Sequence, residues 1–257
     1  MKPRPSDLFC RVLSFAIVAV FFAHAAQAET LYGSNNDSRI VVALEVNQES
    51  VQSQIPEGWS AIPFPGGALA GANTLLVFVD RYLATGADGK PSDPSTFRGV
   101  AFANLAKKND SDEVRTYVTR LYAGVDGYDP YENAAHADIA RSASIESVGS
   151  NAPKRSETWT INRDGGEMVF SIDYESGPLS WGAGEALPYS NTKPDFHRIY
   201  RFDQLVDLAM SEPAGKPLSG SMSLESSIPE LANMFDGSER IVAVIVVPMY
   251  VRSVYLP

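Results

Sequence analysis

Side-chain character alternates with a period of two through Val114-Arg115-Thr116-Tyr117-Val118-Thr119-Arg120-Leu121. Because successive side chains of a strand point to opposite faces, this period predicts a β-strand with one face in water. The polar segment Lys107–Asp112 precedes it and follows another β-rich run, Thr96–Ala106. We therefore expect the two runs to form an antiparallel hairpin with a solvated tip.

Similar runs rich in Val, Ile, Thr, Tyr and Phe recur along the chain between clusters of Gly, Pro, Asn, Asp and Ser. This pattern is typical of many antiparallel strands. Asp164-Gly165-Gly166 joins two of the runs and supplies the positive-φ positions of a second hairpin. The predicted strands are Arg39–Val46, Thr74–Asp80, Thr96–Ala106, Val114–Tyr122, Glu157–Asn162, Glu167–Tyr174, Phe196–Phe202 and Ile241–Tyr255.

Helical signal is sparse. In Glu132–Ser147, small and apolar side chains recur at helical spacing, at Ala135, Ile139 and Ala143, which predicts a packed amphipathic helix. Short helical turns are expected in two further segments, Gln48–Gln54 and Ile228–Phe235. With no linker or internal repeat, residues 29–257 are expected to form a single, mainly β domain with a few helices.

The composition excludes several classes of protein. The chain has 257 residues, of which 44% are hydrophobic and 20% charged, and one cysteine. Abundant aromatic and β-branched residues exclude intrinsic disorder, and one cysteine excludes a disulfide scaffold. Only 21 Lys and Arg stand against 31 Asp and Glu, whereas binding to phosphates requires a basic surplus, so we expect no nucleic-acid partner.

The N-terminus has the layout of a secretory signal peptide. Basic residues precede a 12-residue apolar run, Val12–Ala23, and the small-residue site Ala26-Gln27-Ala28 follows. This predicts a signal peptide over residues 1–28 that is cleaved after Ala28. The apolar run is shorter than the ~20 residues that span a bilayer, so no stable membrane anchor is expected after cleavage. We expect an exported protein, either periplasmic or secreted.

Removal of residues 1–28 would leave 18 basic and 30 acidic residues, a formal charge of -12, and no cysteine. Cysteine catalysis and cysteine-bound zinc are thereby excluded. Two histidines remain, His136 and His197, and the chain has no G-x-S-x-G, H-E-x-x-H, Walker or G-x-G-x-x-G motif. We expect neither a metal nor a cofactor.

Lys154 is the most informative candidate nucleophile. It lies between the predicted helix and the predicted strand Glu157–Asn162. The adjacent cation Arg155 disfavours protonation of the amine, and an apolar pocket would disfavour it further. An amine in that state can attack a carbonyl carbon at neutral pH. The alternative is a Lys-Arg pair at the surface with no chemical role.

Ala152-Pro153-Lys154-Arg155 resembles the Pro-Lys-Lys segment of acetoacetate decarboxylase and its relatives. Four further segments are similar to that family in order and spacing: Val41–Trp59, Thr158–Tyr174, Leu218–Leu224 and Val247–Pro257. The resemblance implies a closed, cone-like antiparallel β-barrel around a ligand cavity. It also implies a lysine that forms a Schiff base with a keto acid, with the protonated imine acting as the electron sink for loss of carbon dioxide.

Carried onto this chain, the resemblance makes Lys154 the nucleophile and Arg155 its cationic neighbour. Phe97-Arg98-Gly99 stands where the family has Tyr-x-Glu, so Arg98 becomes a candidate contact for a substrate carboxylate. Arg141 and Glu146 are nearby candidates for substrate binding at the end of the predicted helix.

Three hypotheses follow. The first is a lyase that acts on a small keto acid through Lys154. The second is a non-catalytic binding protein for a small organic acid, anchored by Arg98 and Arg155. The third is a structural or interaction protein in which Lys154 is simply exposed. A body at -12 repels an organic acid at long range, so binding one requires a local cationic pocket. A homo-oligomer is compatible with each of the three.

Overall fold

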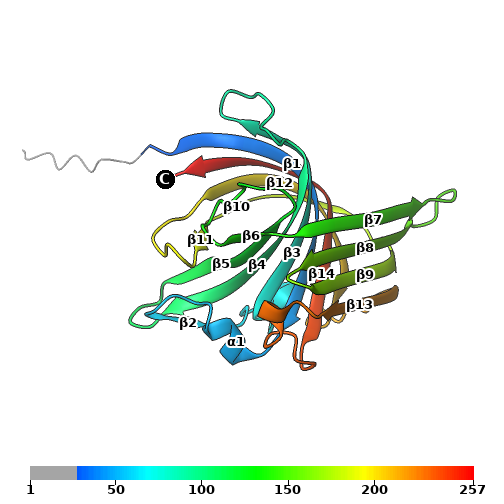
Figure 1. The fold of residues 1–257 in the computed structure, drawn as a ribbon. Coiled ribbons are helices and arrows are strands. Elements are labelled where there is room, and N and C mark those ends of the chain that lie inside the picture. The colour runs from blue at the N-terminus through cyan, green and yellow to red at the C-terminus, as the bar shows by residue number, and fades with distance from the viewer. Residues whose placement is uncertain (1–27) are drawn as a thin grey trace, which may run out of the picture.

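A computed structural model describes residues 28–257. The predicted signal peptide, residues 1–28, lies outside the described residues except for Ala28. The described chain forms two β-sheets joined by loops and short helical segments (Figure 1). The mainly β class expected from the sequence is confirmed.

The larger sheet has ten strands. Its main path follows the order β10-β12-β14-β1-β3-β4-β5-β11, while β2 pairs with β4 and β6 pairs with β5. Most neighbours are antiparallel, but β6 and β11 run parallel to β5. The strands are β1 (Thr30–Glu45), β2 (Trp59–Ala61), β3 (Thr74–Gly86), β4 (Phe97–Lys108), β5 (Val114–Ala123), β6 (Ala134–His136), β10 (Ser180–Ala186), β11 (Pro188–Ser190), β12 (Ile199–Ser211) and β14 (Arg240–Leu256).

The smaller sheet has four antiparallel strands in the order β13-β9-β8-β7. Asp164 and Gly165 both take positive φ at the turn from β8 to β9, which confirms the predicted hairpin. In Figure 1 this sheet extends outward from the side of the larger sheet, and the β7–β8 connection lies at its far end. The strands are β7 (Asp138–Glu146), β8 (Lys154–Arg163), β9 (Gly166–Glu175) and β13 (Gly220–Ser226).

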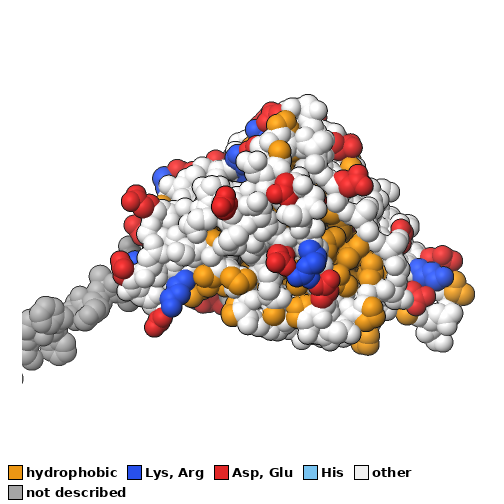
Figure 2. All heavy atoms as spheres, turned by 90° about the horizontal axis from the view of Figure 1, so that it is seen from below, with side chains coloured by type: hydrophobic (Ala, Val, Ile, Leu, Met, Phe, Trp, Pro, Cys, Tyr) orange, Lys and Arg blue, Asp and Glu red, His pale blue; other side chains and the backbone are white. Residues whose placement is uncertain are grey.

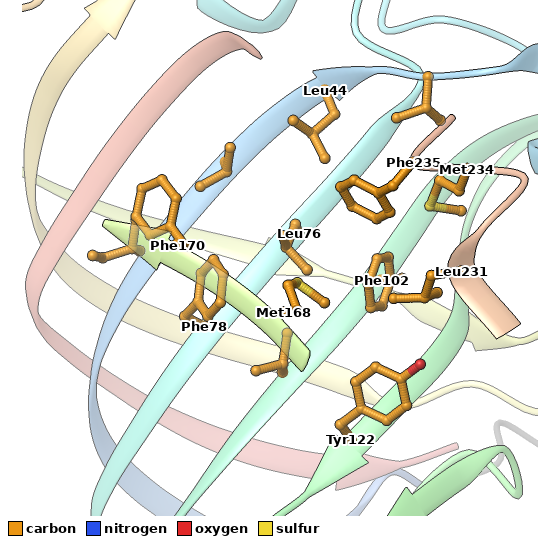
Figure 3. Close-up of a cluster of buried hydrophobic side chains, with 14 of the residues drawn as sticks. Leu44, Leu76, Phe78, Phe102, Tyr122, Met168, Phe170, Leu231, Met234 and Phe235 are labelled. Carbon is orange, nitrogen blue, oxygen red and sulfur yellow. The ribbon is translucent and has the colours of Figure 1, made fainter. Parts of the chain in front are cut away.

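The main hydrophobic core lies between the two sheets. The Phe78 ring of β3 is 5.3 Å from Trp159 of β8 and 5.2 Å from Phe170 of β9, measured between ring centroids. All three side chains are fully buried. Figure 3 shows Met168 and Phe170 close to Leu76 and Phe78 of the larger sheet. Apolar burial between the sheets therefore holds them together.

The larger sheet is not closed into a barrel, which corrects the closed barrel implied by the family resemblance. Its edges are β10 and β11, which follow one another in the chain. β10 pairs with β12, and β11 pairs with β5. On its other side β11 makes only an isolated bridge, between Tyr189 and His197. Among the described residues no strand ladder joins β10 to β11, so the two edges are connected by the chain itself and not by a continuous ladder.

The predicted helix Glu132–Ser147 is wrong, because the segment forms β6 and β7. Ile139 and Arg141 are half-buried while Ala140 and Ser142 are exposed, which is the alternation of a strand. A spacing of four residues is also a multiple of two, so the apolar pattern fits a strand face as well as a helix face. Pairing of β7 with β8 along its whole length decides between them.

The two short helical predictions are confirmed in part. α1 covers Gln48–Gln52, and the Asn47 side chain accepts hydrogen bonds from the amides of Glu49 and Ser50 at its start. The 3-10 helix η2, Pro229–Leu231, lies within the second predicted segment, and a further one, η1, covers Gly67–Leu69. Among the described residues, every helix is too short to cross a membrane.

Candidate functional site

Lys154, Arg155 and Glu146 lie together at the far end of the smaller sheet. β7 and β8 place Glu146 directly opposite Lys154, and all three line an open groove of about 540 Å³. Lys154 is exposed and begins β8 instead of following a helix. Asp173 and Glu175 also line this groove, so its carboxylates outnumber its two cations.

Arg98 and Arg141 meet at a different place, on Asp80 of β3. Arg98 Nε is 3.3 Å and Arg141 Nη1 2.6 Å from the two oxygens of Asp80. Arg141 also binds Glu157 at 2.8 Å. Burial would lower the pKa of the Arg141 guanidinium, but Glu157 and Asp80 raise it above its ordinary value. These two arginines thus neutralise carboxylates of the protein, and the five predicted residues form two clusters instead of one pocket.

A third cluster, with more buried charge, lies on three adjacent strands of the larger sheet. The register places Asn35 of β1 opposite Arg252 of β14, and Asp37 of β1 between Tyr250 of β14 and Arg81 of β3. Arg39 is two residues beyond Asp37 and therefore lies on the same face of β1. Strand pairing alone thus brings three arginines around one carboxylate.

Asp37 is the centre of this cluster. Its side chain is fully buried and its oxygens lie 2.6 Å from Arg39 Nη2 and 3.2 Å from Arg81 Nε. Asn35 donates a hydrogen bond to Asp37 at 2.7 Å and accepts one from Arg252 Nε at 2.9 Å. Burial alone would raise the pKa of the Asp37 carboxyl, but Arg39, Arg81 and Arg252 hold it below its usual value.

Aromatic rings support the arginines. The guanidinium carbon of Arg39 lies 3.5 Å from the centroid of the Tyr250 ring, and that of Arg252 lies 3.8 Å from Tyr200. Arg81 packs over Phe97 at 4.6 Å. Stacking on aromatic faces stabilises desolvated guanidinium groups while leaving their in-plane N–H groups available. Arg39 Nε is buried and has no hydrogen-bond partner among the described residues.

Two hollows meet at these arginines. The inner chamber, about 150 Å³, is bordered by Arg39, Arg81 and Arg252, by three tyrosines, and by apolar residues of β3, β4 and β5. The tyrosines are Tyr128, Tyr131 and Tyr200. The outer chamber, about 410 Å³, shares Arg81 and Arg252 with it and adds Arg198. Asp93 and Asp126, the acidic residues among those that line the outer chamber, are exposed. We call the two together the arginine cavity.

The cavity carries buried positive charge in excess. Three arginines surround the single carboxylate of Asp37, and neither Asp nor Glu is among the residues that border the inner chamber. Burial would lower the pKa of the Arg252 guanidinium, yet Tyr200 and Asp37 raise it above its ordinary value, so Arg252 stays charged. On the face of the molecule in Figure 2, by contrast, basic side chains lie beside acidic ones. The arginine cavity is therefore the place where an anion would be best stabilised.

A larger groove, about 820 Å³, lies between α1 and η2. Its one arginine, Arg120, is ion-paired with Glu230, which also accepts a hydrogen bond from Tyr122 at 2.8 Å. Burial would raise the pKa of Glu230, but Tyr122 and Arg120 lower it. The one cation of this groove is therefore already paired, and its other charged residues, Glu49, Glu132 and Asp236, are acidic. Its geometry points to no particular ligand.

The sequence prediction missed the residues of the arginine cavity. A signal was present in β14, where Tyr250, Arg252 and Val254 are buried and the intervening Val251 is exposed. An arginine in phase with the buried side chains of a strand indicates an interior cation. Arg39 is the first residue of one predicted strand and Arg81 follows the last residue of another, Thr74–Asp80, so the alternation of side chains around them is hard to see.

Comparisons with known proteins identify a fold. No protein-family model matches the sequence, and no curated protein matches it. Among solved structures, the chain is similar to the enduracididine biosynthesis enzyme MppR complexed with pyruvate, with a TM-score of 0.56, 10% identity and 91% of both chains covered. MppR complexed with the condensation product of pyruvate and imidazole 4-carboxaldehyde matches with a TM-score of 0.55 and 10% identity, covering 91% of this chain and 90% of that one.

Acetoacetate decarboxylase from Legionella pneumophila matches with a TM-score of 0.48 and 12% identity, covering 97% of this chain and 96% of that one. The match to MppR shows the fold of this chain. It is the acetoacetate decarboxylase-like fold that the sequence resemblance predicted. At 10% identity the likeness concerns the path of the chain, and function has to be argued from the site.

Proposed function

We propose that the protein binds a small organic acid in the arginine cavity, with the carboxylate held by Arg39, Arg81 and Arg252. The observation that carries this proposal is the excess of guanidinium groups in the cavity over the one carboxylate that they surround, that of Asp37. Arg81 and Arg252 are buried, and the Arg39 side chain is nearly so. A buried cation without a counter-charge is costly, and a bound carboxylate would supply that charge. Arginine also matches a carboxylate with paired, parallel hydrogen bonds.

The setting supports the same class of ligand. The mature chain is expected to carry a formal charge of -12, so an organic acid needs a local positive field to bind. The similar fold of MppR was solved with pyruvate bound. The proposal keeps the second hypothesis from the sequence, a binding protein for a small organic acid. It replaces the anchoring residues, because Arg98 and Arg155 lie outside the arginine cavity.

Calorimetric titration with pyruvate and acetate tests the proposal. We expect binding by the wild type and at least about tenfold weaker binding by Arg252→Gln, since a hydrogen bond to a charged group contributes about 1.5–3 kcal/mol. Arg252→Lys keeps the positive charge but loses the planar guanidinium that can donate two parallel hydrogen bonds, so it should bind with intermediate affinity. Arg240→Gln changes a half-exposed arginine outside the cavity and should bind like the wild type. Absence of binding by the folded wild type, or equal binding by both glutamine variants, would contradict the proposal.

Schiff-base chemistry at Lys154 is the second candidate. It is supported by the family resemblance and by the groove of about 540 Å³ that Lys154 shares with Arg155. Against it, the lysine is exposed and lacks the apolar surroundings that usually activate a nucleophilic amine. Borohydride reduction in the presence of pyruvate or acetoacetate, followed by intact-mass analysis, tests this role. An adduct on the wild type that is lost in Lys154→Arg would establish it, and no adduct would reject it.

We further propose that the protein is exported and that residues 1–28 are its signal peptide. The basic start, the 12-residue apolar run and the Ala26-Gln27-Ala28 site support this. Expression of the full chain in a bacterium, followed by fractionation and intact mass, tests it. The expected product outside the cytoplasm begins at Glu29, whereas a full-length cytoplasmic product would contradict export.

A further inference from the structure

We infer that the ligand of the arginine cavity is an acid with a short aliphatic tail, and that the tail lies in the inner chamber against β3 and β4. This inference rests on the proposed function and adds to it the nature of the group that the carboxylate carries. Its basis is the division of the inner chamber into a polar end, lined by the arginines and the tyrosines that contact them, and an apolar end.

The apolar end is built by alternate residues of two neighbouring strands. Gly99, Ala101 and Ala103 of β4 border the inner chamber, as do Val77 and Val79 of β3. The register pairs Val79 with Gly99 and Val77 with Ala101, so small residues of β4 stand beside valines of β3. This wall carries no polar side chain that could receive a hydroxyl group of the ligand.

The burial pattern of β4 shows that its small residues leave space. Ala101 and Ala103 are half-buried, although Phe102 between them is fully buried on the opposite face. On the face that packs against the smaller sheet, β4 thus fills the space with a large ring. On the cavity face, the residues of β4 that follow Phe97 and border the inner chamber are only Gly99, Ala101 and Ala103.

The volume of the inner chamber sets the length of the tail. At ~30 Å³ for each water-sized group, about 150 Å³ accommodates roughly five such groups. With the carboxylate on the arginines, this corresponds to an acid of about four to six carbon atoms. A tail bearing hydroxyl groups would lose its hydrogen bonds to water without replacing them at this wall.

Calorimetric titration of the full mature chain with the unbranched saturated acids from acetate to octanoate tests the inference. We expect the affinity to rise by about fourfold for each added methylene, to reach a maximum at about four to six carbons, and to fall for octanoate. A hydroxylated acid of the same length as the best ligand should bind at least about tenfold more weakly.

Ala101→Leu provides the structural arm of the test, because its larger side chain would project into the inner chamber. The maximum should shift to acids that are shorter by about two carbons, and the ratio of pentanoate to acetate affinity should fall at least about tenfold. Ala183→Leu, at an exposed position of β10, is the matched control and should keep the wild-type profile. Thermal unfolding checks that both variants are folded, and Ala103→Val offers a milder filling of the same chamber.

The outcomes separate this inference from the proposed function. If acetate and pyruvate bind through Arg252 but affinity does not depend on tail length, or Ala101→Leu leaves the profile unchanged, the tail inference is overturned and the proposed function stands. If no acid in the series binds, both are overturned. A length optimum that Ala101→Leu shortens and Ala183→Leu does not would establish the inner chamber as the site of the tail.

Discussion

At the scale of single residues, Asp37 connects stability with the candidate site. Its fully buried carboxylate contacts Arg39 and Arg81 and accepts a hydrogen bond from Asn35. A buried ion pair adds little relative to a well-packed apolar substitute, but removing one partner leaves the other charge uncompensated. Asp37 therefore holds together a cluster of like charges that would otherwise repel one another.

Asp37→Asn should destabilise the protein by about 3–5 kcal/mol at neutral pH, because the three arginines lose their only buried counter-charge. Urea unfolding followed by fluorescence measures the change. Asp88→Asn is the control, since Asp88 is exposed and pairs only with the exposed Lys90; it should change stability by less than about 0.5 kcal/mol. Equal stability of Asp37→Asn and wild type would show that the cluster is not held by this carboxylate.

The acid dependence of stability should report the same group. The pKa of Asp37 is lowered in the folded state from about 3.8, so its contribution is present above that value and is lost as the pH falls through the lower folded-state pKa. The wild type should therefore lose more stability than Asp37→Asn between about pH 5 and pH 2. Urea titrations at several pH values compare the two slopes, and parallel slopes would contradict the assignment.

At the scale of elements, close backbone contacts fix the smaller sheet. A Cβ atom at Gly166, which begins β9, would lie 2.3 Å from the carbonyl oxygen of Ser227 and 2.7 Å from the Cα of Ile228. Ser227 also donates its backbone amide to the carbonyl oxygen of Glu167 at 2.7 Å. The glycine therefore allows the chain after β13 to lie directly against the start of β9.

Gly166→Ala should lower the free energy of unfolding by about 1–3 kcal/mol, because backbone atoms must move to admit the methyl group. The same substitution at Gly182 of β10 is the control, since a Cβ there meets no atom within 4 Å. Gly182→Ala should be neutral or stabilising by up to about 1 kcal/mol. Thermal and urea unfolding compare the pair, and equal effects at both positions would contradict the close contact.

At the scale of the whole molecule, the two sheets share one core and should unfold together. Phe78, Trp159 and Phe170 join them and are fully buried. Phe170→Ala should therefore cost about 3–5 kcal/mol in a single cooperative transition. Trp181→Ala removes a larger side chain that is 59% exposed and should cost much less. Two separate transitions, by calorimetry, would show that the smaller sheet folds independently.

The sequence predicted the strands with strong local patterns and missed those without one. Every predicted strand coincides at least in part with an observed one, because alternation and β-branched residues are local signals. The short, Gly- and Ala-rich β10 lacked such a signal, and β7 was mistaken for a helix because a spacing of four residues fits both periods. β10 is a strand because it pairs with β12, and β7 is a strand because it pairs with β8. Neither pairing can be read from a local pattern.

The sequence by itself determined the mainly β class, the two hairpins, the acidic charge and the resemblance to acetoacetate decarboxylase-like proteins, because each depends on residue type or local spacing. Only the tertiary structure decided that the sheet stays open between β10 and β11 and that Lys154 lies far along the smaller sheet. It also decided that Arg39, Arg81 and Arg252 converge on Asp37, although Arg39 and Arg252 are more than 200 residues apart in the chain. The physical reason is strand register, which decides which side chains are neighbours across the sheet. Register depends on pairing between segments that are distant in the chain, so a local sequence pattern does not show it.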